Sequence, residues 1–151
     1  MTAPLDRGAG APPVGLLLLS HGPLAEALRE TVHVLEPETP ETCGALSLAW
    51  DEAPEKASQR LREAISASDR GRGVVLLTDM FGGTPSNLAL AFRERDKVEI
   101  VTGVNLPMVL KAIALCRIGE GPAEIACTLV ERGRRSIVAA AELMETEQVR
   151  S

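Results

Sequence analysis

Two short stretches of this chain carry residues that could do chemistry together. His21 follows an apolar run that begins at Val14, and Asp79 follows a second apolar run at 74–78. Wholly apolar runs of this length are typical of strands that are covered on both faces of a sheet. In open α/β sheets, ligands bind at the carboxyl ends of the strands. If these two strands are neighbours, His21 and Asp79 meet at that edge.

A carboxylate beside an imidazole prepares the ring for nucleophilic attack. If Asp79 accepts the Nδ1 proton of His21, it fixes the tautomer of the ring, and the Nε2 lone pair then points outward. The stretch GGTPS that follows begins a predicted helix, so it offers free backbone N–H groups and small residues that let an anion approach. Gly82, Gly83 and Thr84 therefore form a candidate seat for a dianion. A nucleophilic imidazole beside such a seat indicates phosphoryl transfer to histidine.

The order of the predicted elements decides which fold can bring these residues together. Apolar runs predict strands at 14–20, 43–50, 74–78 and 98–103. Helical spacing, with prolines near the helix starts, predicts helices at 23–35, from Pro54 to the turn at 69–73, at 84–92, at 107–116 and at 121–133. This alternation predicts an α/β fold with a doubly wound, mainly parallel sheet of four strands and helices on both faces. A last apolar segment at 135–140 is a candidate fifth strand.

Composition narrows the class of protein. A chain of 151 residues with 45% hydrophobic and only 2% aromatic residues suits one domain with an aliphatic core. The formal net charge of −5 and the scarcity of aromatic side chains argue against a nucleic-acid partner. No apolar run approaches the roughly 20 residues of a membrane span, so we expect no direct membrane insertion. An odd number of cysteines without a CxxC motif indicates buried, reduced thiols and a cytoplasmic location: Cys43, Cys116 and Cys127.

The two ends of the chain are predicted to lie outside the folded domain. Residues 1–13 are rich in Gly, Pro and Ala and lack the basic start and apolar stretch of a signal peptide. We therefore expect a flexible tail at 1–13, one domain at 14–142 and a C-terminal tail at 143–151.

The residues named so far belong to longer stretches that resemble one known family. These stretches are GLLLLSHG at 15–22, VVLLTDMFGGTPSNLAL at 74–90, VEIVTGVNLPMVLKAI at 98–113 and EIACTLVERGRRSIVAA at 124–140. They resemble the IIA domain of the mannose family of the sugar phosphotransferase system, over nearly the whole chain from Val14 to about Ala141. The runs D-x-[FW]-G-G-[ST]-P-x-N and G-V-N-[LI]-P-M, together with the N-terminal HG, are specific signals.

The resemblance implies a cytoplasmic phosphocarrier. Its histidine, matched here by His21, takes a phosphoryl group from the carrier protein HPr and passes it to a IIB component. Asp79 matches the carboxylate that bonds to that ring, and Thr84 matches a hydroxyl residue that contacts the phosphoryl group. Members of the family are homodimers that exchange a final antiparallel strand, which 135–140 would supply. The resemblance implies no cofactor and no metal, and since the chain ends at Ser151 we expect a separate IIA subunit.

Exposed apolar residues beside a reactive centre often form a docking patch, so Met80 and Phe81 are candidate partner contacts, with simple packing of the loop as the alternative. Asn105 and Pro107 follow the predicted strand at 98–103. They either form the turn after this strand or line the rim of the site. Trp50, at the end of the strand at 43–50, is interpreted as rim packing, with a partner-surface role as the alternative.

Four other functions compete with the phosphocarrier. A regulatory protein would use the same His21 chemistry to control a partner's affinity without sugar transport. The phosphocarrier subunit of dihydroxyacetone kinase is built on a similar domain, but the intact GGTP segment argues against it. A metal enzyme of the cobaltochelatase type would need a second ligand histidine, and only His33, inside a predicted helix, is available. A hydrolase with Ser20 as nucleophile lacks the G-x-S-x-G pattern. No residue identifies a sugar.

Overall fold

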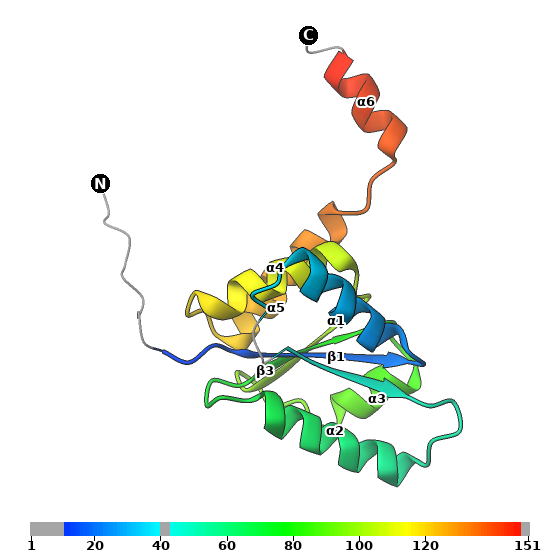
Figure 1. The fold of residues 1–151 in the computed structure, drawn as a ribbon, viewed down its shortest axis with the longest axis vertical. Helices are drawn as coiled ribbons and strands as arrows, with labels where there is room; N and C mark the ends of the chain where they lie inside the picture. Colours follow the sequence, from blue (N-terminus) through cyan, green and yellow to red (C-terminus); the bar gives the residue numbers. More distant parts are fainter. Residues whose placement is uncertain (1–10, 40–42, 149–151) are drawn as a thin grey trace.

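The computed structural model describes residues 11–39 and 43–148 and shows a four-stranded sheet between two layers of helices (Figure 1). The strands are β1 (Gly15–His21), β2 (Cys43–Leu48), β3 (Val74–Thr78) and β4 (Val98–Thr102). The helices are α1 (Leu24–Leu35), α2 (Pro54–Ser68), α3 (Thr84–Leu90), α4 (Leu106–Arg117), α5 (Pro122–Arg135) and α6 (Ala140–Gln148). The first four predicted strands and the five predicted helices are confirmed, and only their ends differ.

The two central strands of the sheet, β1 and β3, are the ones that His21 ends and Asp79 follows. The strand order is β2-β1-β3-β4, and every pair is parallel. Leu19 of β1 lies opposite Thr78 of β3, so His21 and Asp79 follow at adjacent strand ends. The order along the chain reverses between β1 and β3, and such a switch point opens a crevice at the carboxyl edge of a sheet. The condition under which His21 and Asp79 were expected to meet, that their strands are neighbours, is therefore fulfilled.

Consecutive leucines of β1 belong to two different cores, because side chains alternate between the faces of a strand. Leu16 and Leu18 pack in the core that α1, α4 and α5 cover. Leu17 and Leu19 pack in the core that α2 and α3 cover. Figure 1 shows α1, α4 and α5 on one side of the sheet and α2 and α3 on the other. All four leucines are 1% exposed, so burial on both faces accounts for the unbroken apolar run.

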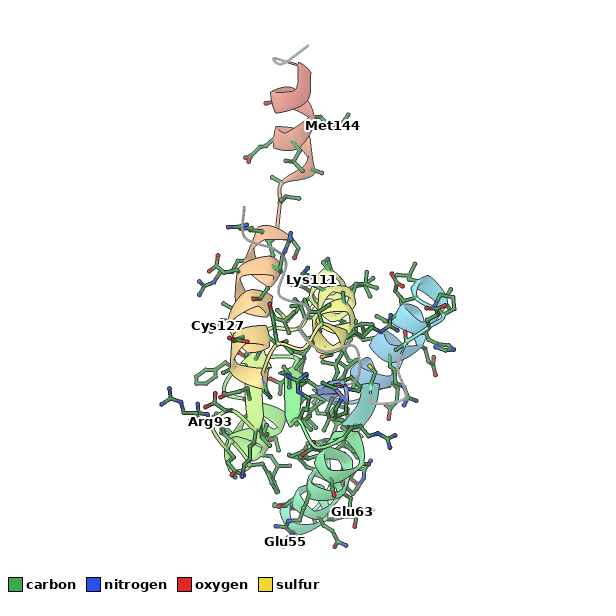
Figure 2. All side chains as sticks on the ribbon, turned by 90° about the vertical axis from the view of Figure 1, so that its left-hand side faces the viewer. Glu55, Glu63, Arg93, Lys111, Cys127 and Met144 are labelled. Atoms are coloured by element: carbon green, nitrogen blue, oxygen red, sulfur yellow. The ribbon has the colours of Figure 1, made fainter. Side chains whose placement is uncertain are left out.

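The predicted strand at 135–140 is not a strand in this chain. Arg135 ends α5, Ala140 begins α6, and the residues between them form no regular element. Figures 1 and 2 show α6, which carries Met144, standing clear of the body of the domain. A strand exchanged between subunits would pair only on the partner, so the exchange stays a prediction. The helix also occupies most of the segment at 143–151 that was predicted as a tail.

The cysteines differ in part from the expectation of three buried thiols. Cys43 and Cys116 are buried, and burial raises the pKa of Cys43 to about 11 and that of Cys116 to about 12. Both are therefore neutral thiols that act as small apolar core residues. Cys127 is exposed, because it lies on the outer face of α5, as Figure 2 shows.

Candidate functional site

His21 and Asp79 meet at the carboxyl edge of the sheet. Nδ1 of the His21 ring lies 2.7 Å from Oδ2 of Asp79, and the main-chain N–H of His21 donates to the same oxygen at 2.9 Å. The other carboxylate oxygen accepts the N–H of Met80 at 2.9 Å. The side chains are 23% and 12% exposed for His21 and Asp79, so the ring reaches solvent while the carboxylate is mostly covered.

The protonation state of Asp79 fixes the tautomer of His21. Burial pushes the pKa of Asp79 upward, but hydrogen bonds from the His21 main chain, the His21 ring and the Met80 main chain outweigh burial, so the pKa is lowered. Asp79 is therefore an ionised carboxylate at neutral pH, and an ionised carboxylate can only accept hydrogen bonds. The proton of a neutral His21 ring consequently lies on Nδ1, which leaves the lone pair on Nε2.

A tight turn after β1 brings the chain from His21 into α1. Gly22 adopts a φ of +52°, a conformation that residues with a Cβ rarely take, and its N–H donates to the Leu48 carbonyl at 2.9 Å. The buried Ser20 hydroxyl accepts the N–H of Ala25 at 2.7 Å. Ser20 thus stabilises the start of α1, and its buried hydroxyl gives no support to the alternative in which Ser20 is a nucleophile.

The glycines of the second loop lie against the free edge of the imidazole. A Cβ placed on Gly83 would come 2.5 Å from Cε1 of His21 and 3.1 Å from Nε2. Gly83 is also the N-cap of α3, and no side chain caps that end. Gly82 takes a φ of +83°, and Thr84, the exposed first residue of α3, follows. Of the three residues predicted to hold a phosphate, Gly83 therefore lies against the Nε2 edge of the ring, and Gly82 and Thr84 flank it in the chain.

The four predicted partner contacts divide into two pairs. Met80 and Phe81 project from the loop beside Asp79 and are 55% and 73% exposed. Asn105 instead caps α4, since its Oδ1 accepts the Met108 N–H at 3.0 Å and its Nδ2 donates to the Gly133 carbonyl at 3.5 Å. Pro107, in the first turn of α4, borders a hollow whose other walls come partly from α5. Asn105 thus ties the start of α4 to α5, and Pro107 lies in the first turn that follows it.

One residue of the site was not predicted as such. The indole of Trp50 stacks on the His21 ring with a centroid separation of 5.5 Å and an angle of 21° between the planes. The sequence predicts Trp50 as the last residue of a strand, but β2 ends two residues earlier and Trp50 lies in the following turn. The available signal was the only tryptophan of the chain, placed at the carboxyl edge of the sheet.

Other classes of site find no support among the residues that the structure describes. Within 11–39 and 43–148, no three His, Cys, Asp or Glu side chains lie together so that they could hold a metal ion. His33 is exposed on α1. No described helix is both long and apolar enough to cross a membrane.

The sequence of this chain matches those of known proteins. The sequence model of the family described as "PTS system fructose IIA component" matches residues 15–126. The chain is 27% identical over 127 residues to the PTS system mannose-specific EIIAB component of Escherichia coli (strain K12), a match that covers 83% of this chain and 39% of that protein. The chain thus spans well under half the length of that relative. It is also 27% identical over 103 residues to the PTS system fructose-specific EIIA component of Bacillus subtilis (strain 168), covering 68% and 70% of the two chains.

A solved structure agrees with the sequence matches. The PTS IIA protein associated with the fucose utilization operon of Streptococcus pneumoniae superposes with a TM-score of 0.77 at 27% identity, covering 89% of this chain and 98% of that one. The family match spans most of the domain, including β1 with His21 and the loop with Asp79. This chain belongs to the mannose family of IIA components of the sugar phosphotransferase system.

Proposed function

We propose that this chain is a phosphocarrier that takes a phosphoryl group onto Nε2 of His21 and passes it on. One observation carries the proposal: Asp79 holds Nδ1 of the ring at 2.7 Å, while the opposite edge of the ring faces the loop at Gly83. The ring is thereby held in the tautomer whose free lone pair adjoins small residues and main-chain N–H groups. An imidazole with this orientation and partial exposure suits in-line transfer of a phosphoryl group between two proteins.

The transfer step needs no proton relay. The Nε2 lone pair of His21 attacks the phosphorus of the donor phosphohistidine, and the N–P bond of the donor breaks as the new N–P bond forms. The Nδ1 proton stays in place, so the His21 ring gains positive charge while the phosphoryl group moves. The ionised Asp79 stabilises that positive charge. Delivery to an acceptor is the same step in reverse.

The loop after Asp79 is the proposed seat of the phosphoryl group. The main-chain N–H groups of Gly82, Gly83 and Thr84, with the Thr84 hydroxyl, supply donors for the phosphoryl oxygens. Such donors are required because a phosphoryl group brings a charge of about −1.5 to −2 close to the Asp79 carboxylate. The positive charge of the phosphorylated ring and the loop donors together offset this repulsion.

The proposed donor is phospho-HPr and the proposed acceptor is a IIB component. The support is membership of the IIA family and the exposed apolar side chains of Met80 and Phe81 beside the ring. Apolar side chains exposed next to a reactive group suit a protein that docks and leaves. We place Asn105 and Pro107 at the rim of this docking face, because Asn105 lines the same groove as Phe81 and Pro107 follows in the first turn of α4. A cytoplasmic location accompanies the proposal, because the resemblance implies carriers of that compartment.

We further propose that the working unit is a homodimer. β4 pairs with β3 on one side, and no strand within 11–39 and 43–148 covers its other side. Beside it runs a groove of about 510 Å³ whose lining residues include Phe81, Leu90, Ile100 and Ile137. Ile137 and Val138 are themselves exposed. A second copy that laid its segment 136–139 along this edge would bury the apolar surfaces of both chains.

Substitution of His21 and Asp79 tests the phosphocarrier directly. We expect no phosphorylation of His21→Ala when labelled phosphoenolpyruvate, enzyme I and HPr are supplied. Asp79→Asn should keep transfer at a rate lowered roughly 10²- to 10⁴-fold, because an amide donates to Nδ1 and moves the ring proton onto Nε2. The measurement is the rate of label incorporation, with the site located by mass spectrometry.

His33→Ala is the matched control, since it removes the other histidine of the chain, and it should be labelled at the native rate. Complete loss in Asp79→Asn, equal to that in His21→Ala, contradicts the orienting role of the carboxylate. A folded native chain that takes no label from its cognate HPr contradicts the phosphocarrier itself.

Gly83→Ala tests the approach of the loop to the ring. The added Cβ would lie 2.5 Å from Cε1 of His21, so the ring or the loop has to shift. We expect the transfer rate to fall by about 100-fold, as misplacement of a reacting group by about 1 Å can cause. Gly121→Ala is the control, because a Cβ there meets no atom within 4 Å. A native rate in a folded Gly83→Ala variant would show that the ring does not rest against this loop.

Ile137→Asp tests the dimer. A charge in a buried apolar contact should raise the dimer dissociation constant about 10- to 100-fold, which sedimentation equilibrium measures. Val34→Asp is the matched control, since Val34 and Ile137 are both 78% exposed but Val34 lies on α1. A native chain that stays monomeric at every concentration, or equal association in both variants, rules out the exchanged segment.

A further inference from the structure

Trp50 lies over the proposed phosphoacceptor although most of its surface faces solvent. Its ring is stacked on the imidazole of His21 at 5.5 Å between centroids and 21° between planes, within the range of offset aromatic pairs. The same indole lies beside Gly22, where a Cβ would meet Cζ2 of Trp50 at 3.6 Å. Trp50 is 83% exposed. Burial in a core therefore does not explain this tryptophan, whereas contact with the active-site turn does.

The turn that carries Trp50 is held in place from both sides. Arg60 of α2 donates to the two carboxylate oxygens of Glu52 at 2.7 and 2.8 Å, and Glu52 also accepts the main-chain N–H of Ala49. The hydrogen bonds from Arg60 lower the pKa of Glu52, so this carboxylate is ionised at neutral pH. The Glu52 side chain is only 4% exposed. The main-chain N–H of Glu52 also donates to the Ala49 carbonyl at 3.3 Å, so Trp50 projects from a turn that is held at both ends.

Asp79 alone does not fix the plane of the His21 ring. The χ2 torsion of histidine is broad, because it joins an sp³ carbon to an sp² carbon. One hydrogen bond at Nδ1 holds one corner of the ring and leaves rotation about that contact. A flat indole on one face of the ring, with the Gly83 backbone at its far edge, removes that rotation. The nitrogen opposite Asp79 then keeps a constant direction.

We propose that Trp50 is a positioning residue for phosphoryl transfer, which acts by stacking on His21 and holding the plane of the ring so that Nε2 faces the loop at Gly83. The inference rests on the proposed phosphocarrier function and adds a residue that the family match does not assign. Phenylalanine can stack in the same way, and alanine cannot. Trp50→Phe therefore keeps an aromatic ring on His21, and Trp50→Ala removes it.

The stack itself is measured without any partner protein. Proton NMR of the histidine rings reports an aromatic neighbour, because the ring current of a stacked indole shifts the His21 resonances upfield. We expect these resonances to move downfield in Trp50→Ala and to remain largely shifted in Trp50→Phe. His33, exposed on α1, provides an internal reference that should not move.

The effect on transfer is measured as kcat and KM for phospho-HPr. We expect Trp50→Ala to lower kcat roughly 2- to 10-fold with KM unchanged. Without the indole, the His21 ring can rotate, and this rotation has to be lost again in the transition state. Trp50→Phe should restore most of kcat. Val34→Ala, which truncates another exposed apolar side chain, is the matched control and should transfer at the native rate. Equal melting temperatures show that each variant is folded.

Each outcome supports or overturns the proposal. An upfield-shifted His21 in the native chain, a lower kcat in Trp50→Ala and recovery in Trp50→Phe support it. A native His21 without the upfield shift overturns it, and so does a raised KM with unchanged kcat, which identifies Trp50 as a docking residue. If the native chain accepts no phosphoryl group, the phosphocarrier function fails and the inference with it. Native transfer with an unaffected Trp50→Ala overturns the inference alone.

Discussion

The hydrogen bond between Asp79 and the Nδ1 atom of His21 is the interaction on which the rest of the site depends. It exists because β1 and β3 are parallel neighbours, so that residues after both strands reach the same edge of the sheet. The same carboxylate oxygen also accepts the main-chain N–H of His21, which ties the ends of the two strands together. The Asp79 side chain therefore links the ends of β1 and β3 and leaves Nε2 as the nitrogen of His21 without a proton.

This arrangement restricts what can surround the ring. The loop reaches its far edge only because Gly83 has no Cβ, and the chain leaves β1 through the positive φ of Gly22. The face of the ring that the backbone leaves open is covered by Trp50. The hydrogen bond from Asp79, the backbone of Gly83 and the indole of Trp50 thus contact the imidazole on three sides, while the His21 side chain stays 23% exposed.

The pairing of His21 with Asp79 was predictable because the sequence shows where the two strands end. Unbroken apolar runs mark strands buried on both faces, and the titratable residues that follow them mark the edge where they meet. Asn105 was less predictable, because an N-cap and a rim residue have the same local sequence. Trp50 was not predictable, since its stack depends on the anchoring of the turn by Arg60, a contact between two elements. The apolar run at 135–140 predicts a strand, but in this chain the residues between α5 and α6 form no regular element, because an apolar run alone does not supply the neighbouring strand that it would pair with.

The most direct test of the account is the position of the phosphate on the ring. We would phosphorylate the ¹⁵N-histidine-labelled chain through phospho-HPr and read both ring nitrogens of His21 by NMR. The account predicts a phosphorus coupling on Nε2, with Nδ1 still protonated and hydrogen-bonded to Asp79. A phosphate on Nδ1 would contradict it, because that nitrogen would have to leave the carboxylate before it could react.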